Sequence, residues 1–218
     1  MILADLLSRE KGVCIPGCYD GFSALLVEQA GFPAAFLSGG SLAMARLGRP
    51  DIGLVTAAEL IDTVMQITDR IAIPLIVDGD TGFGNALTLQ RAIRQLSRAG
   101  AAAVTIEDQS FPKRCGHMAG KRVVSVTEAA GRIRAAVDAA DGMAIIARSD
   151  ALAIEGLEAT LDRAETYLEA GADMLFIEGP ETMAQVDAIA SRFASRVPLF
   201  HNLVEGGTSP SAQSAPFF

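Results

Sequence analysis

Short apolar runs rich in β-branched residues recur along the chain, and longer stretches with helical periodicity follow most of them. The pattern predicts seven strands, at 13–18, 34–38, 74–80, 103–108, 144–150, 174–178 and 198–203. Between them it predicts helices, among which are 57–70, 87–99, 127–140, 157–170 and 181–193. Strands that alternate with helices in this way are typical of βαβ units and of a parallel sheet.

Capping signals mark several of the predicted helix ends. Thr56 followed by Glu59 is a capping-box pattern, and Thr127 is a candidate N-cap. Gly100 and Gly171 each follow a helical stretch directly, where glycine commonly ends a helix.

Two architectures accommodate this alternation: an open, doubly wound sheet and a closed (β/α)8 barrel. The run 74–77 is apolar throughout, as a strand of a parallel sheet covered by helices must be. No G-x-G-x-x-G turn follows an early strand, although a dinucleotide-binding doubly wound sheet usually carries one. We therefore predict an α/β fold of the (β/α)8 TIM-barrel type. Its last βα unit is missing, because no strand follows 198–203.

The predicted barrel forms one domain, residues 1–205, and residues 206–218 form an irregular tail. The tail consists mostly of small residues and has neither helical nor strand periodicity. We interpret it as the product of a truncation or a shifted reading frame.

Composition narrows the function. Half of the 218 residues are hydrophobic, the formal net charge is −8 and the sequence pI is about 4.8. An acidic chain without a basic stripe is a poor partner for nucleic acid or an anionic membrane, so we predict a small molecule as its partner. There is no basic leader and no apolar run of about 18 residues that could span a membrane. The three cysteines, an odd number, favour a reducing compartment, and we predict a cytoplasmic protein.

Polar side chains gather where the predicted strands end. Asp78 and Asp80 close the third strand, and a spacing of two places both carboxylates on one face. Further strands end in Glu107-Asp108, Arg148-Ser149-Asp150, Glu178 and Asn202, and barrel enzymes place their catalytic residues at these ends. Carboxylate ligands without a His or Cys cluster favour a hard cation, Mg²⁺ or Mn²⁺. The alternative is that some of these acids are helix N-caps.

Two further segments carry candidate chemistry. Ser38-Gly39-Gly40 follows the second strand, where backbone N–H groups can approach an anion; alternatively the glycines only form a turn. The segment 109–124 is long and polar for a βα loop, and we predict a mobile lid. It contains Cys115 beside Lys113, Arg114 and His117, which favours a reactive thiolate.

The remaining cysteines and the second histidine are predicted to be structural. Cys14 and Cys18 lie in or beside an apolar strand and are interpreted as small buried side chains. His201 precedes Asn202 and should point the opposite way along its strand.

Five motifs in order resemble those of the isocitrate lyase and phosphoenolpyruvate mutase superfamily, over residues 10 to 207. They are Ser38-Gly39-Gly40, the run 78–84, Ile106-Glu107-Asp108, Lys113-Arg114-Cys115-Gly116-His117 and the run 202–207. The mutase, phosphonopyruvate hydrolase and oxaloacetate decarboxylase branches lack the loop cysteine, so the chain resembles the lyase branch. Residues 118–124 are similar to the 2,3-dimethylmalate lyase group at least as much as to 2-methylisocitrate lyases.

The resemblance implies a role for individual residues. It implies that Asp78 and Asp80 hold Mg²⁺, with Glu107 and Asp51 in support. It implies that Cys115 is the general acid, that His117 and Arg114 orient and charge-balance this step, and that Glu107 also belongs to the catalytic set. The implied substrate-binding residues are Tyr19, Ser38, Gly39, Gly40, Gly116, Arg148, Glu178 and Asn202.

The implied activity is Mg²⁺-dependent cleavage of a carbon–carbon bond in a substituted 2-hydroxy di- or tricarboxylate of the 2-methylisocitrate or 2,3-dimethylmalate type. The products are a 2-oxo acid, pyruvate or glyoxylate, and a carboxylate. The resemblance also implies a homo-oligomer, which is a tetramer in the family. Two alternatives stay open: an oxaloacetate decarboxylase of the same superfamily, and a catalytically silent, truncated remnant.

Overall fold

The computed structural model describes residues 3, 6–7, 12–116, 120–204 and 210 of the chain. Within these residues, seven strands form one parallel sheet in the sequential order β1 to β7. The strands are β1 (Gly17–Cys18), β2 (Ala35–Leu37), β3 (Leu75–Asp78), β4 (Ala103–Glu107), β5 (Ala144–Ser149), β6 (Met174–Ile177) and β7 (Leu199–Phe200).

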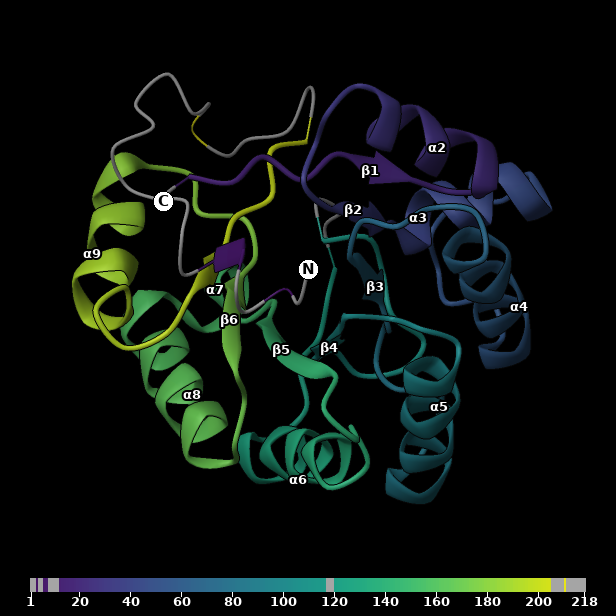
Figure 1. The fold of residues 1–218 in the computed structure, drawn as a ribbon. Helices are drawn as coiled ribbons and strands as arrows, with labels where there is room; N and C mark the ends of the chain where they lie inside the picture. Colours follow the sequence, from purple (N-terminus) through teal and green to yellow (C-terminus); the bar gives the residue numbers. More distant parts are fainter. Residues whose placement is uncertain (1–2, 4–5, 8–11, 117–119, 205–209, 211–218) are drawn as a thin grey trace.

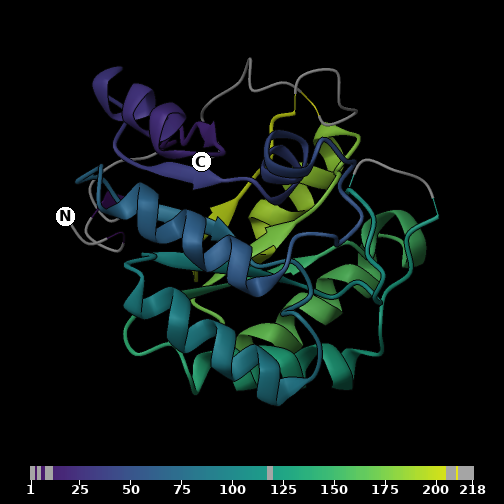
Figure 2. The same ribbon diagram turned by 90° about the vertical axis from the view of Figure 1, so that its right-hand side faces the viewer.

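The helices alternate with the strands along the chain. They are α2 (Gly21–Gln29), α3 (Gly39–Leu42), the π-helix η1 (Ala43–Leu47), α4 (Ala57–Thr68), α5 (Ala86–Arg98), α6 (Val126–Val137), α7 (Leu152–Glu155), α8 (Leu157–Glu169) and α9 (Met183–Phe193). The longer helices follow one another around the outside of the curled sheet (Figure 1). Figure 2 shows the blue and teal helices α4 and α5 lying in front of the strands. The α/β barrel-type fold predicted from the sequence is confirmed, with seven strands among the described residues.

The strand residues divide between two cores because side chains alternate along a strand. Ile145 and Ala147 of β5 belong to the larger core, between the sheet and the helices. Ile146 points the other way, into a smaller core enclosed by the curled sheet, where it joins Ile76 and Phe176.

The enclosed core is apolar at one end and polar at the other. Leu3 and Leu6 from the start of the chain belong to its apolar part. Two residues beyond Ile76, Ile146 and Phe176, the inward positions are Asp78, Arg148 and Glu178, all of which are buried. The period of two along each strand thus carries polar side chains to the carboxyl end of the barrel, over an apolar floor.

Most helix ends agree with the predicted signals. Thr56 and Glu59 form the capping box of α4, and Gly100 and Gly171 adopt positive φ angles of 93° and 99° just beyond α5 and α8. The prediction for Thr127 is wrong. The N-cap of α6 lies two residues earlier, at Ser125, whose hydroxyl accepts the hydrogen bond from the N–H of Glu128.

The predicted strand ends and helix starts contain further errors. The strand predicted at 13–18 is shorter than expected. Only Gly17–Cys18 forms a strand, β1, and residues 13–16 do not. The structure also contains α2, α3, η1 and α7, which were not among the predicted helices. Cys14 is exposed, so its interpretation as a buried side chain is wrong, whereas Cys18 is buried in the core. Burial, with a smaller effect of Asp20, raises the pKa of the Cys18 thiol to about 12.

In the part of the chain that the structure describes, no helix combines the length and the apolar character needed to cross a membrane. The predicted boundary between the barrel domain and the tail falls at 205–206, outside the described residues.

Candidate active site

Asp78 and Asp80 meet at the carboxyl end of β3 around the start of α3. The carboxylate of Asp78 accepts hydrogen bonds from the N–H of Gly39 (3.2 Å) and from the hydroxyl of Thr105 (3.3 Å). A Cβ at Gly39 would lie 3.0 Å from Asp78 Oδ2 and 3.4 Å from Asp80 Oδ1, so both carboxylates face this glycine closely. Asp80 lies beyond the strand with a φ of 48°.

Lys113 supplies a positive charge within the acid cluster, which consists of Asp51, Asp78, Asp80 and Glu107. Its Nζ lies 2.5 Å from Asp51 Oδ1 and 2.6 Å from Asp80 Oδ1, and its side chain is 2% exposed. Burial alone would lower the pKa of Lys113, but Asp78, Asp80 and Glu107 raise it above its ordinary value. The ammonium is therefore charged and anchors the loop to the carboxylates.

The carboxylates themselves crowd one another. Burial and the charge of Asp78 raise the pKa of Asp80 to about 7, although Lys113 lowers it in part. Burial also raises the pKa of Glu107, against the lowering effect of Arg148. Two acids with raised pKa values in one place are typical of functional sites.

The carboxylates of the acid cluster are chemically suitable ligands for a hard divalent cation. Asp51, Asp78, Asp80 and Glu107 offer only oxygen atoms, the ligands that Mg²⁺ and Mn²⁺ prefer. Oε1 of Glu107 is buried and has no hydrogen-bond partner among the described residues. No group of three or more His, Cys, Asp or Glu side chains in those residues is arranged as a preformed metal site, and the ammonium of Lys113 lies between two of the carboxylates.

Arg148 forms a second centre, near the carboxyl end of β5. Asp150 holds its guanidinium through two contacts, Nε to Oδ2 at 2.9 Å and Nη2 to Oδ1 at 3.2 Å. Nη2 also lies 3.1 Å from Glu178 Oε2, and the guanidinium stands 4.9 Å from the ring centroid of Phe176. Burial lowers the pKa of Arg148, but Asp150, Glu178 and Glu107 raise it more, so the group stays charged.

The loop of residues 109–116 and 120–124, the Cys115 loop, spans these two centres. Lys113 reaches the carboxylates, and a Cβ on Gly116 would lie only 2.5 Å from Arg148 Nη2. Cys115 stands in the chain between these two anchor points and is half-buried. At the base of the loop, Gln109 pairs with Val123 as an isolated antiparallel bridge. The described part of the predicted lid is therefore docked onto the site.

Several other predicted residues lie around the same centres. The amide of Asn202 donates to Glu178 (3.4 Å), and Gly40 faces Asp51, which a Cβ would approach to 3.4 Å. Ser38 caps α3 by accepting from the N–H of Ser41.

Of the remaining predicted residues, two are exposed and one lies outside the described residues. Tyr19 is 44% exposed, and the hydrogen bond that the structure gives it, from its backbone N–H to Ser23, is local. Arg114 is exposed, and its backbone pairs with the side chain of Gln109. His117 lies outside the described residues.

Two sequence interpretations need correction. The first residues after Ser38 form helix α3 rather than a Gly-Gly turn, and the N–H of Gly39 already donates to Asp78. The acids at the strand ends are not N-caps, because the described helices are capped by other residues, such as Asn85 before α5.

Sequence reasoning assigned no catalytic, substrate-binding or metal-binding role to three residues of the site: Lys113, Lys121 and Asp150. Lys113 stood inside the recognised motif and Asp150 at a strand end, so both had a signal. Lys121 had no signal in the sequence. Its Nζ lies 3.0 Å from Asp150 Oδ1 only because the loop folds back onto the barrel.

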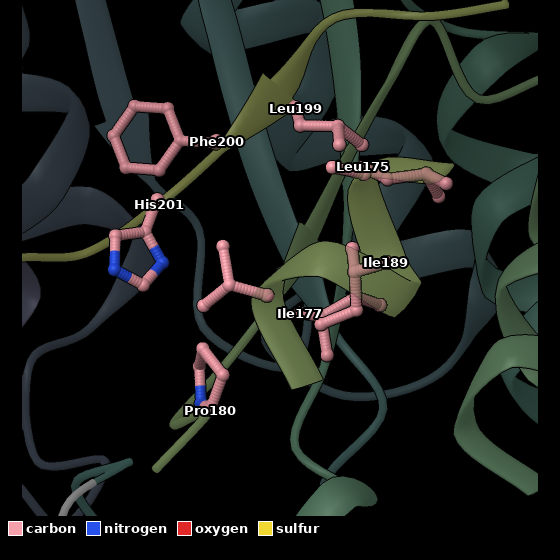
Figure 3. A pocket seen from close by; sticks show the side chains of 9 residues that line it. Leu175, Ile177, Pro180, Ile189, Leu199, Phe200 and His201 are labelled. Carbon is pink, nitrogen blue, oxygen red and sulfur yellow. The ribbon is translucent and has the colours of Figure 1, made fainter. Parts of the chain in front are cut away.

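An apolar pocket lies between β6, β7 and α9 (Figure 3). It is lined by Leu175, Ile177, Pro180, Val186, Ile189, Ala190, Leu199, Phe200 and His201. His201 therefore belongs to this apolar wall, and burial lowers its pKa. The neighbouring Asn202 turns to Glu178 instead.

Comparisons with known proteins agree with this geometry. The model of the phosphoenolpyruvate phosphomutase family matches residues 3–214. A 2-methylisocitrate lyase of Salmonella typhimurium is 46% identical over 209 residues, covering 94% of this chain and 70% of the relative.

Two solved structures share the fold closely. One is 2,3-dimethylmalate lyase, a phosphoenolpyruvate mutase/isocitrate lyase superfamily member, with a TM-score of 0.92 and 36% identity over 97% of this chain and 71% of the other. The other is oxaloacetate acetylhydrolase with the inhibitor 3,3-difluorooxalacetate, with a TM-score of 0.90 and 36% identity over 94% and 71%. The chain belongs to the phosphoenolpyruvate mutase/isocitrate lyase superfamily, in which it groups with carbon–carbon lyases.

Proposed function

We propose that the protein is a Mg²⁺-dependent lyase that cleaves a substituted 2-hydroxy di- or tricarboxylate of the 2-methylisocitrate or 2,3-dimethylmalate type. The products are a 2-oxo acid, pyruvate or glyoxylate, and a carboxylate. One observation carries this proposal: the Cys115 loop is anchored on the acid cluster through Lys113 and packs on Arg148 through Gly116. Cys115 lies in the chain between these two anchor points, which would hold its thiol near the proposed cation site and near Arg148.

The acid cluster is the proposed metal site. Asp78 and Asp80 would hold the ion, with Glu107 and Asp51 in support, and Mn²⁺ could replace Mg²⁺ because both take oxygen ligands. When bound, the ion acts as a Lewis acid that stabilises negative charge on the substrate's reacting oxygen.

The other groups of the site handle the substrate and its protons. Arg148 pairs with a substrate carboxylate, and Asp150 fixes the plane of its guanidinium. The hydroxyl proton leaves to Glu107, whose Oε1 is buried and has no hydrogen-bond partner among the described residues.

Cleavage of the carbon–carbon bond then takes place in a single step. The carbon–carbon bond breaks as the hydroxyl oxygen forms the carbonyl of the 2-oxo acid, and the bonding electron pair moves to the carbon beside the departing carboxylate. Cys115 donates its thiol proton to that carbon, with the docked loop keeping water away.

The test is release of 2-oxo acid, followed with a coupled dehydrogenase. The panel contains 2,3-dimethylmalate, 2-methylisocitrate, isocitrate and oxaloacetate, each with Mg²⁺ and with EDTA. We expect turnover of a hydroxy acid in Mg²⁺ only. Turnover of oxaloacetate alone would replace the proposal, with carbon dioxide indicating a decarboxylase.

A hydrolase is the second candidate, favoured by the likeness to the solved oxaloacetate acetylhydrolase. Its signature in the same panel is oxalate, detected by chromatography, without any carbon dioxide. Absence of all turnover from a protein with a native circular dichroism spectrum would support the silent remnant.

A further inference from the structure

A buried ion pair ties the far side of the Cys115 loop to the barrel. Lys121 Nζ lies 3.0 Å from Asp150 Oδ1, and the two side chains are 6% and 0% exposed. Removing one partner of such a pair leaves an uncompensated charge away from water, so the pair resists separation.

Asp150 is the same carboxylate that holds Arg148. Its Oδ2 accepts from Arg148 Nε, while Oδ1 receives both Arg148 Nη2 and Lys121 Nζ. Burial raises the pKa of Asp150, but Arg148 and Lys121 lower it more, and it lies below its ordinary value. A charged carboxylate is thus shared between Arg148 and the loop cation Lys121.

The backbone at Asp150 is held in place by Asp108 at the end of β4. Its N–H donates to Asp108 Oδ1 at 2.9 Å. Asp108 in turn accepts at Oδ2 from the hydroxyls of Ser149 (2.7 Å) and Tyr167 (2.8 Å). The position of the Asp150 carboxylate is therefore set by the sheet and by α8, and the loop binds to a rigid partner.

Lys121 makes a second contact next to the thiol. Its Nζ donates to the carbonyl oxygen of Gly116 at 2.5 Å. Gly116 follows Cys115 directly and packs on Arg148 and Glu178 so closely that a Cβ would lie within 3 Å of both side chains. One ammonium therefore joins Asp150 to the residue beside the proposed acid.

We propose that Asp150 and Lys121 are positioning residues. Asp150 binds both Arg148 and Lys121, and Lys121 binds the backbone beside Cys115. The carboxylate of Asp150 therefore fixes the guanidinium of Arg148 and the thiol of Cys115 relative to each other. The inference rests on the proposed function for its catalytic consequence. The placement of the loop can be tested without it.

The first test measures how well the thiol is protected. Lys121→Met removes the ammonium but keeps most of the side-chain length, and Arg122→Met is the matched control, because Arg122 is the exposed neighbouring cation. The metal-free proteins are alkylated with iodoacetamide, and the rate at Cys115 is read from its peptide by mass spectrometry. The exposed Cys14 gives the internal reference rate in each sample.

We expect Lys121→Met to speed alkylation of Cys115 at least about tenfold, because the loop loses its buried anchor. Loss of a nearby cation would by itself slow alkylation, since the thiolate is the reacting form, so acceleration reports opening of the loop. Arg122→Met and the Cys14 rate should stay within about twofold of the wild type. An unchanged Cys115 rate in Lys121→Met overturns the inference, whether or not the protein is a lyase.

The second test uses the substrate that the panel identifies. We expect Lys121→Met to lower kcat at least about tenfold with a smaller change in KM, since the thiol is misplaced while Arg148 keeps its partner. Asp150→Asn should lower kcat and raise KM together. Lys121→Arg, which keeps a cation, should recover part of kcat. Equal kcat in Lys121→Met and wild type overturns the catalytic part, whereas an inactive wild type with accelerated alkylation in the variant refutes only the proposed function.

Discussion

Glu107 and Asp108 are consecutive carboxylates at the end of β4 that serve opposite faces of the sheet. Glu107 faces the barrel interior, where its Oε2 lies 3.5 Å from Arg148 Nε. Asp108 faces the helices and accepts from the hydroxyl of Tyr167 in α8 at 2.8 Å. Burial raises the pKa of both carboxyl groups. Of two adjacent acids, one therefore belongs to the site and the other to the scaffold beneath it.

The proposed acid role of Cys115 predicts a contrast between two cysteines. Cys115→Ser should fold normally yet lose about 10²-fold or more of hydroxy-acid cleavage, because a serine hydroxyl is a far weaker acid than a thiol. Cys14→Ser should cost little, since Cys14 is exposed outside the site. Steady-state kinetics on both purified variants measures the contrast, and equal losses would exclude Cys115 as the acid.

Gly116 predicts a steric requirement in the docked loop. In Gly116→Ala the new Cβ would lie 2.5 Å from Arg148 Nη2 and 2.7 Å from Glu178 Cγ, and Asp150 prevents the guanidinium from moving aside. We expect kcat/KM to fall at least about tenfold, since misplacement of about 1 Å can cost that much or more. The melting temperature should change little, because Gly116 is only half-buried and belongs to neither apolar core.

The control for that variant is Gly131→Ala. Gly131 lies inside α6, and a Cβ there meets nothing within 4 Å. Alanine should stabilise the protein by about 0.5–1 kcal/mol through helix propensity, and kcat/KM should stay at the wild-type value. A similar loss of kcat/KM in both variants would mean that the Gly116 effect is not specific to the loop.

The order of the sheet and the location of the site follow from local sequence patterns. Alternating strands and helices dictate a parallel sheet, and a period of two carries Asp78, Arg148 and Glu178 inward above Ile146 and its neighbours. These features depend on residues a few positions apart, which is why they could be predicted.

What could not be predicted depends on contacts between distant segments. Lys113 and Lys121 reach their carboxylates only because the loop folds back across the barrel mouth. Helix α2 was missed for a different reason. Its apolar residues include the exposed Phe22 and Leu26 as well as the buried Val27. The apolar positions therefore do not form the single stripe from which an amphipathic helix is predicted.

Asp80 predicts how stability depends on pH in the metal-free protein. Burial and Asp78 raise its folded-state pKa to about 7, above the value of about 3.9 expected in the unfolded chain. The folded state therefore binds more protons between these values, and its free energy of unfolding falls as pH rises from about 4 to 7. Glu107, whose pKa is also raised, contributes with the same sign.

Urea unfolding in EDTA at pH 5, 6 and 7 measures this slope. Asp80→Asn should flatten it, because the amide does not titrate and repels Asp78 less. Adding Mg²⁺ should stabilise the wild type more at pH 7 than at pH 5, since a cation competes with protons for these oxygens. Identical slopes in wild type and Asp80→Asn would contradict the assignment of the titration to Asp80.

Tyr167 provides a test of the scaffold separately from the site. Its hydroxyl donates to Asp108 Oδ2 and accepts from Arg163 Nη1 at 3.3 Å, while its ring lies in the core between sheet and helices. Tyr167→Phe keeps the ring but removes a hydrogen bond to a charged group, which should lower the free energy of unfolding by about 1.5–3 kcal/mol.

The same substitution should leave catalysis nearly intact. Asp108 retains its bonds from Ser149 and from the N–H of Asp150, so the carboxylate of Asp150 keeps its place under Arg148. Denaturant unfolding and kcat measured on one preparation compare the two effects, with the exposed Tyr19→Phe as the stability reference. If Tyr167→Phe lost activity at unchanged stability, the hydroxyl would belong to the catalytic network, and the division between Glu107 and Asp108 would be wrong.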